Sequence, residues 1–553
     1  MYAMLKKLTV VLLCWALSLQ ARAADVLPVV EVRGDRIVIY PQRMELTGEE
    51  TLLDILEMYP DLMGGGYDDL LAGSGLRDSY QLRLENVPVS GDTRLTVTQM
   101  KARLISKIQI CDNVGVAKGR TGDGRVIDVN LQKADEGAHG FLSLQGGTDG
   151  QFAPSGSLRY GGEKTEIWSA LTYSYDDADD VMGKAEHFHF MMTNRLSPRD
   201  LLRSYVTQSA SVTDMTGRSS RSHMRSRTLM GRLRYFHTFN EQGTELLTLL
   251  SWAHQYAPSD NYGSDLSLRR CETAETNSPM LLLELNTPLF TKNLSLMAGY
   301  EGELDVIRYN VDDASEGNER DRYQMTNHDL YLQLDYRTGP LRLTVGDRVM
   351  FYHYRQEIAQ EERSYSDTRN NFMASGVLTH SRYHQVQVAY YRKFYNPSLM
   401  SIRPLDEVVT NQYRVSYAYS RPTFSAKLDG SMYRADDADS WSVDGAVCKK
   451  MGIWSLTAGF NVYGTRPAGG ERFTIADIRL VPVARLPQAL QVSAKIIWYS
   501  TRSPYRMLRE NTAFYGSLQA DKQLGRHWNI HAEWHDMFCR QRSAALGGIM
   551  YRF

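Results

Sequence analysis

The sequence is poor in net charge and in long apolar stretches. Among its 553 residues, lysines plus arginines almost equal aspartates plus glutamates, which leaves a formal net charge of −1. A chain without a basic excess is not typical of a nucleic-acid-binding protein, so we expect no nucleic-acid partner. Beyond residue 23, no apolar run reaches the roughly eighteen residues of a membrane-spanning helix, so no such helix is predicted.

Cysteine is also scarce. The chain has five cysteines, and the four beyond the N-terminal segment are Cys111, Cys271, Cys448 and Cys539. They form no C-x-x-C pair, which excludes a zinc ribbon and a thioredoxin-like site. An oxidising compartment would permit a disulfide, but the spacing does not select a pair. Isolated free thiols are the simpler interpretation.

Catalytic signatures are missing as well. The sequence contains no H-E-x-x-H motif, and no Ser-His-Asp set or pair of catalytic carboxylates can be singled out. The glycines of Gly64–Gly66 and Gly119–Gly124 are not followed by the Gly-Lys-Ser/Thr of a phosphate-binding loop. We therefore expect neither an enzyme nor a cofactor.

The N-terminus has the pattern of an export signal. Lys6 and Lys7 precede an apolar core over Leu8–Leu19, which is too short to span a membrane as a helix. Ala21-Arg22-Ala23 is an A-x-A cleavage site. Residues 1–23 are therefore predicted to be a signal peptide.

From residue 139 to 553 the chain repeats runs of alternating apolar and polar residues. In Asn327–Arg337, Leu330, Leu332 and Leu334 alternate with charged or polar residues, and Trp528–His535 has the same pattern. Successive side chains of a strand point to opposite faces, so each run has one apolar and one polar side. Such a pattern over some 400 residues is typical of a transmembrane β-barrel with a wet interior.

Turn residues separate these runs and allow the strands to be counted. Short turns are predicted near Ser197–Asp200, Thr338–Pro340 and Gln523–Arg526, and longer polar loops near Tyr175–Lys184 and Tyr309–Tyr323. About ten short turns alternate with about eleven loops, which predicts an all-β antiparallel barrel of about 22 strands. Short turns would face the periplasm, and the 33 tyrosines fit aromatic girdles at both interfaces of an outer membrane.

The C-terminal strand has the pattern expected of an insertion signal. Ala545, Gly547, Ile549, Tyr551 and Phe553 share one face. A terminal Phe with Tyr two residues before it resembles the signal by which the barrel-assembly machinery recognises its substrates. Tyr551 and Phe553 are therefore predicted to direct insertion into outer-membrane lipid.

Residues 24–138 differ from the rest. Glu49–Tyr59 has apolar residues at helical spacing, with Pro60 directly after it, and short strands are predicted at Tyr80–Leu84, Lys107–Cys111 and Val126–Leu131. A helix mixed with short strands predicts a compact α/β domain. A barrel of about 22 strands has a wide lumen that is typically plugged.

This segment resembles the plug of TonB-dependent outer-membrane receptors. Leu52–Pro60 is similar to the plug's leucine-rich helix, and Gln81–Pro88 to its "I-x-I-D-G-x-P" strand and turn. Ile105–Ile110 resembles "I-x-x-I-E-V", and Gly115–Leu131 resembles the Gly-rich last turn and strand. The resemblance implies import of a small-molecule, peptide or glycan substrate, energised through TonB. Asp61 departs from the family pattern, which has Gly after the proline.

The stretch that follows the predicted cleavage site has two interpretations, as a TonB-contacting segment or as the first strand of the plug. Val26–Val32 is an extended apolar stretch just after the cleavage site, and such boxes bind their partner as an added strand. Val29, Val30, Glu31 and Val32 are the TonB-contact candidates. The same stretch fits the first strand of the plug equally well.

Two patterns raise the question of metal ions. His187 and His189 lie on one face of a predicted strand, and acidic clusters occur at Asp176–Asp180 and Asp436–Asp439. The histidines have no third ligand nearby, and the acids lack EF-hand spacing. Lumen polarity and solvated loops explain both, so no metal site is expected.

The pattern predicts an outer-membrane barrel, and the resemblance implies that it is a TonB-dependent importer. A plugged barrel that no longer transports and serves as a surface scaffold or receptor is the alternative. A barrel enzyme such as an outer-membrane protease or lipase is the least favoured.

Overall fold

The computed structural model describes most of residues 136–552 and several segments before them. The earlier segments are residues 30–33, 36–43, 52–57, 80–84, 87–88, 100, 102–111 and 125–132. Within 136–552 the description omits 149, 179–180, 217–219, 264–267, 314–316, 359–360, 382, 395–408, 422, 436–437, 468–472, 489, 501–513, 526, 536 and 538–542. The predicted signal peptide and Phe553 lie outside the described residues.

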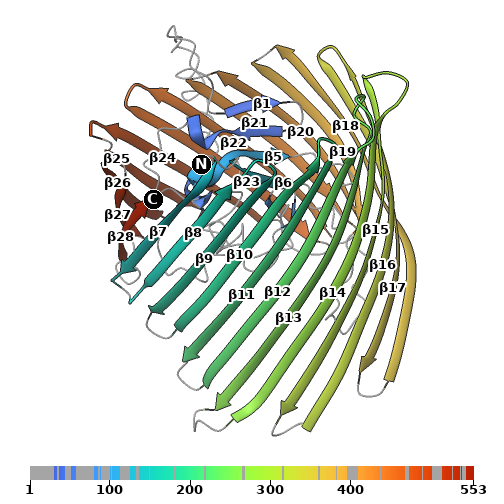
Figure 1. Ribbon diagram of the computed structural model, residues 1–553, viewed down its shortest axis with the longest axis horizontal. Helices are drawn as coiled ribbons and strands as arrows, with labels where there is room; N and C mark the ends of the chain where they lie inside the picture. Colours follow the sequence, from blue (N-terminus) through green and yellow to red (C-terminus); the bar gives the residue numbers. More distant parts are fainter. Residues whose placement is uncertain are drawn as a thin grey trace.

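The larger part of the structure is a closed barrel (Figure 1). Its strands are β7(Gly137–Gly147), β8(Phe152–Gly161), β9(Thr165–Ala178), β10(Val181–Ser197), β11(Asp200–Thr216), β12(Ser220–Thr238), β13(Glu245–Gly263), β14(Leu268–Pro288), β15(Leu294–Asp313), β16(Gly317–Thr338), β17(Leu341–Ile358), β18(Glu361–Ser381), β19(His384–Phe394), β20(Val409–Arg421), β21(Phe424–Arg434), β22(Ala438–Met451), β23(Trp454–Pro467), β24(Phe473–Leu486), β25(Leu490–Tyr499), β26(Phe514–Leu524), β27(Trp528–His535) and β28(Ala544–Arg552). These 22 strands follow one another in chain order, and β28 pairs with β7 to close the ring. The predicted antiparallel barrel and its strand number are confirmed.

The alternating apolar and polar residues of each strand lie on opposite sides of the barrel wall. On β16, Asp329 and Asp335 are buried, whereas Leu330 and Leu332 are 53% and 50% exposed. The apolar side chains form the outer, lipid-facing surface, and the polar ones point inward. Closure leaves no unpaired strand edge in the ring, as a structure in lipid requires.

The barrel is taller on one side. β14, β16 and β18 have 21, 22 and 21 residues, whereas β25 and β27 have 10 and 8. Figure 1 shows the green and yellow strands reaching well beyond the red ones. A tilted strand needs about 9–11 residues to cross a bilayer, so the long strands extend beyond the membrane.

The loops predicted at Tyr175–Lys184 and Tyr309–Tyr323 are mostly strand, which corrects that part of the sequence interpretation. β15 continues to Asp313 and β16 begins at Gly317, so the connection between them is very short. Above the membrane both faces of a strand are in water, and the apolar–polar alternation that marks a spanning strand is lost there.

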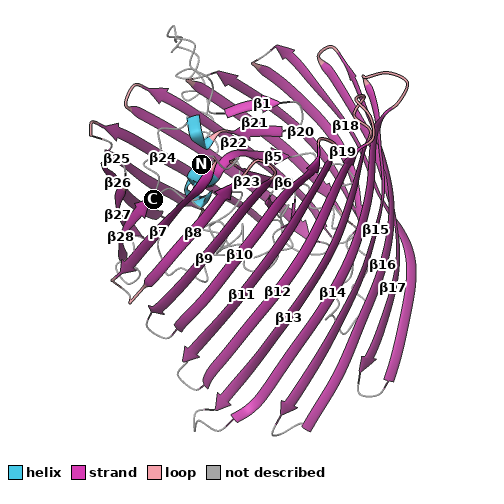
Figure 2. Ribbon diagram, in the orientation of Figure 1, coloured by secondary structure: helices cyan, strands magenta, loops and turns pink. Residues whose placement is uncertain are grey.

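A second, six-stranded sheet lies inside the barrel (Figure 2). Its strands are β1(Val30–Arg33), β2(Arg36–Ile39), β3(Tyr80–Leu84), β4(Val87–Pro88), β5(Ile105–Cys111) and β6(Arg125–Leu131), in the order β1-β2-β5-β6-β3-β4. The helix α2(Leu52–Glu57) and the short 3-10 helices η1(Pro41–Arg43) and η2(Ala102–Leu104) accompany it.

The inner sheet and the barrel wall share one apolar core. Ile55 of α2, Ile108 of β5 and Ile127 of β6 are fully buried in it, and Trp168, Tyr205 and Met230 join it from the wall. The described residues contain no helix that is long and apolar enough to span a membrane. The division of the chain at residue 139 and the role of the inner sheet as a plug stay predictions.

Candidate functional site

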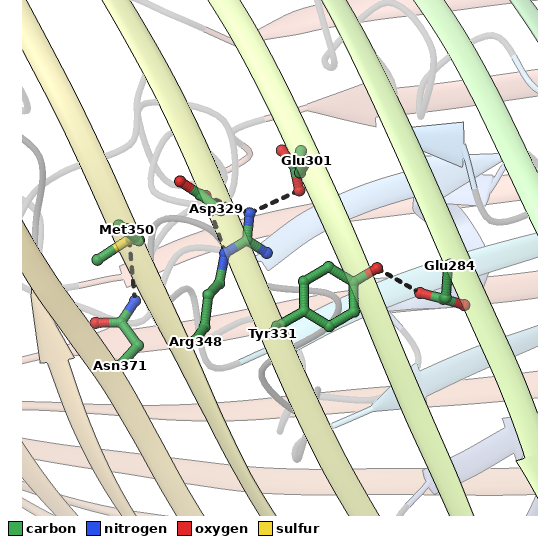
Figure 3. Close-up of polar contacts among 7 residues, drawn as sticks. All are labelled: Glu284, Glu301, Asp329, Tyr331, Arg348, Met350 and Asn371. Carbon is green, nitrogen blue, oxygen red and sulfur yellow. Dashed lines mark hydrogen bonds and ion pairs between the residues drawn. The ribbon is translucent and has the colours of Figure 1, made fainter.

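The inner wall of β14–β17 carries a connected set of charged side chains (Figure 3). Glu301 on β15 and Asp329 on β16 are directly opposite each other in the antiparallel register. Two carboxylates in that position repel each other. Their inward direction follows from the alternation, but their meeting follows only from the register.

Arg348 on β17 bridges the two carboxylates. Its side chain is fully buried, and its Nη2 lies 2.5 Å from Asp329 Oδ2 and 2.6 Å from Glu301 Oε2. Its Nε also donates to Asp329 Oδ2 at 3.0 Å. Arg348 pairs in register with Tyr331, so it reaches Asp329 diagonally and Glu301 across a whole strand. A guanidinium suits this task because its fork of donors can serve two acceptors at once.

Tyr331 extends the network toward β14. Its hydroxyl donates to Glu284 Oε2 at 2.9 Å, and the Arg348 guanidinium lies 5.4 Å from its ring centroid. The ring lies over Gly299, its direct partner on β15, so closely that a Cβ there would come within 2.3 Å of it. A glycine at this position is therefore what allows the ring to lie across the strand toward Glu284.

Apolar and sulfur-containing side chains adjoin the charged set. Tyr331, Met373, Ala389 and Tyr391 form a buried cluster, against which Leu282 and Met297 pack. Asn371 Nδ2 lies 3.9 Å from the sulfur of Met350. The wall therefore places carboxylates beside aromatic and thioether groups, and most of these side chains are buried.

A second buried ion pair lies further round the wall. Arg414 on β20 donates to Asp429 Oδ2 on β21 through Nε at 2.8 Å and Nη2 at 2.5 Å. Both side chains are almost completely buried. Within the described part of the chain, Arg348 and Arg414 are thus both held by acidic partners on neighbouring strands.

The histidines at i, i+2 lie where the wall meets the inner sheet. His187 and His189 are buried with ring centroids 3.9 Å apart. Tyr205 Oη and His189 Nδ1 are 2.9 Å apart, and Trp168 stacks on His189. Trp168 and Tyr205 belong to the core shared with the inner sheet. Among the described residues no group of three or more His, Cys, Asp or Glu could hold a metal ion.

The other predicted site residues are widely separated. Val30, Glu31 and Val32 form β1, which pairs with β2 at one edge of the inner sheet, and Val29 lies outside the described residues. Tyr551 is partly exposed on the outer side of β28, and its ring centroid lies 4.8 Å from that of Trp528. Cys271 and Cys448 are free thiols; Cys539 lies outside the described residues.

The Arg348 network is the part that sequence reasoning missed. The alternation does place Asp329 and Tyr331 on the polar face of their strand. It gives no information on which residues of β15 and β17 lie beside them, so no constellation could be assembled from spacing alone.

No protein-family model matches the chain, and no curated protein matches its sequence. Solved structures do match its fold. The alcaligin outer-membrane receptor FauA of Bordetella pertussis has 14% identity and a TM-score of 0.70, covering 95% of both chains.

Two further structures give the same result. The ferric yersiniabactin uptake receptor FyuA of Yersinia pestis has 12% identity and a TM-score of 0.73, covering 94% of this chain and 98% of its own. The copper transporter OprC has 11% identity and a TM-score of 0.71, covering 96% of this chain and all of its own.

The protein therefore has the fold of the TonB-dependent outer-membrane receptors, as the resemblance predicted. It is an outer-membrane-type β-barrel. The neighbours named here are receptors or transporters rather than enzymes.

Proposed function

We propose that the protein imports a substrate across the outer membrane through a barrel that its N-terminal domain closes. The observation that supports this most directly is the inner sheet, whose core is continuous with Trp168, Tyr205 and Met230 of the wall. A domain packed inside a barrel this wide closes a conduit that would otherwise leak. Transport then requires the domain to rearrange, and small elements of this kind can open locally.

The substrate would bind on the inner wall. The carboxylates and the Tyr331 cluster of β14–β19 offer charged and apolar contacts side by side. The structural neighbours are receptors for alcaligin and ferric yersiniabactin and a copper transporter. A small molecule or a metal complex would be the imported substrate by analogy with these neighbours, and peptides and glycans are the other substrate classes that the proposal includes.

The energy would come through TonB, and Val29–Val32 would be the contact. β1 is an edge strand of the inner sheet, with β2 as its neighbour in the sheet and β20 of the barrel wall close to it. An edge strand presents unpaired backbone groups to which a partner strand can bind. Residues 30–32 would in this way belong to the inner sheet and also bind a strand of TonB at its edge.

Binding of the periplasmic domain of TonB to the full-length protein in detergent tests this proposal. Val30→Pro removes a backbone donor and should abolish binding. Val30→Thr keeps the donor and the strand preference, so it should bind like wild type. Both variants should keep the gel-mobility shift between unheated and boiled protein that marks a folded barrel.

Equal binding of Val30→Pro and wild type would reject β1 as the coupling strand. No binding by wild type would favour the alternative, a plugged barrel that acts as a surface scaffold or receptor. The pairing of Val30–Val32 with β2, rather than a separate box, is the observation that favours this alternative.

A further inference from the structure

A groove of about 700 Å³ crosses the lipid-facing surface of β11–β16. It follows two rows of neighbouring residues across the strands. One row runs from Val206 through Gly231, Trp252 and Pro279, which are successive register partners. Leu233, Leu250, Leu281, Gly302 and His328 form the other row. The groove is therefore apolar along most of its length.

Missing side chains make the hollow. Gly231 faces outward between Val206 and Trp252, and a Cβ built on it would meet nothing within 4 Å. The aromatic side chains of Trp252 and Tyr300 line the groove. Tyr300 Oη lies 2.8 Å from His328 Nδ1. Polar groups thus occur at one end of a surface that is otherwise apolar.

A ladder of basic residues continues from the groove along β12. Arg221, His223, Arg225 and Arg227 alternate with inward residues and therefore share the outward face of Gly231 and Leu233. They lie toward the end of β12 opposite the short turn to β13, on the part of the strand beyond the apolar belt. The ladder therefore lies at or above the membrane surface.

Acidic residues pair with only part of this ladder. Arg225 is 54% exposed and lies 3.5 Å from Asp260, and His223 Nδ1 lies 2.5 Å from Asp214 Oδ1. No described residue forms an ion pair with Arg227, which is exposed. Arg227 lies four residues from Gly231 on the same strand and face, directly above the groove.

We propose that this surface binds a phosphorylated lipid of the outer leaflet, with an acyl chain in the groove and a phosphate on Arg225 and Arg227. Arginine forms short, charge-assisted hydrogen bonds with phosphate oxygens. The apolar groove can hold an acyl chain by van der Waals packing, and no polar group has to be desolvated to do so. An apolar groove below exposed cations matches the order of chain and headgroup in a lipid that stands in the membrane.

Native mass spectrometry of the full-length protein in detergent, titrated with diphosphoryl lipid A, tests the proposal. The double variant Arg225→Ala/Arg227→Ala should bind at least about tenfold more weakly, because charge-assisted hydrogen bonds are lost. Gly231→Leu fills open space on the outer surface and should weaken binding without affecting folding. Arg392→Ala is the matched control, since Arg392 is exposed on the outward face of β19, away from the groove.

Two further probes test the groove and the arginines separately. One is lipid A that lacks its phosphates, and the other is inorganic phosphate alone. Both should bind much more weakly than the diphosphoryl lipid. Equal binding of both lipid A forms, or an equal loss in Arg392→Ala and in the double variant, would overturn the proposal. A dimer that Gly231→Leu disrupts, with no lipid retained, would also overturn it, because the groove would then be an interface between two copies of the chain.

Discussion

Replacing Arg348 by methionine should destabilise the barrel more than most single substitutions in it. Methionine keeps much of the side chain's length but removes the charge that Asp329 and Glu301 share. The two carboxylates would then be directly opposite each other with no guanidinium between them. Asp329 is almost completely buried, so water cannot replace the lost partner without rearrangement of the wall.

The magnitude follows from the burial of the network. Removing one partner of a buried ion pair costs about 3–5 kcal/mol, because a buried charge is left uncompensated. Arg348 serves two acids, so the upper part of that range is expected. Neutralising all three, as Arg348→Met/Asp329→Asn/Glu301→Gln, removes the stranded charges and should recover most of the loss.

Equilibrium unfolding in urea, with the protein refolded into lipid vesicles and followed by tryptophan fluorescence and gel mobility, measures the free energy of unfolding. The single variant should unfold at clearly lower urea than wild type, and the triple variant close to wild type. A change below about 0.5 kcal/mol for Arg348→Met, the range of neutral surface substitutions, would refute the role given to this residue. A triple variant weaker than the single one would show that geometry, not charge, dominates.

Three further predictions concern other parts of the molecule. Gly299→Ala places a Cβ against the Tyr331 ring and should cost about 1–3 kcal/mol of unfolding free energy, whereas Gly231→Ala on the outer face should be nearly neutral; equal effects would contradict the packing argument. Deleting residues 24–138 should leave a barrel that conducts ions in planar bilayers, while the whole protein stays nearly closed; equal conductance would reject the plug. Phe553→Asp should lower the amount of protein in the outer membrane, and Phe553→Tyr should not; normal abundance of the Asp variant would remove the insertion signal.

Local chemistry explains why the barrel could be predicted from sequence. Alternation with a period of two shows which side chains face lipid, because the pleat of a strand sets that direction wherever the strand lies. The turn near Ser197–Asp200 and its counterparts contain residues whose backbone preferences end a strand. Counting them predicted 22 strands, and β3 coincides with the strand predicted at Tyr80–Leu84.

The same local signals fail where both faces of a strand are wet. The sequence predicted a loop over Tyr309–Tyr323, where β15 and β16 extend beyond the membrane, because these extensions have no apolar face. Hydrogen bonds between neighbouring strands hold these extensions in the β conformation, as the unbroken register of β15 with β16 from Leu294 to Asp313 shows. Strand length beyond the membrane was therefore decided by the tertiary structure.

The candidate site depended on tertiary structure even more strongly. Glu284, Glu301, Asp329 and Arg348 come from four strands, and their inward direction could be predicted from alternation alone. Their contact could not, because the register between strands is set by hydrogen bonding and packing over the whole hairpin. A slip of two residues that places Arg348 opposite Gln333 instead of Tyr331 would leave the alternation unchanged while separating Arg348 from both acids. The sequence by itself determined that this chain forms a barrel with polar groups inside; only the folded ring decided which of those groups meet.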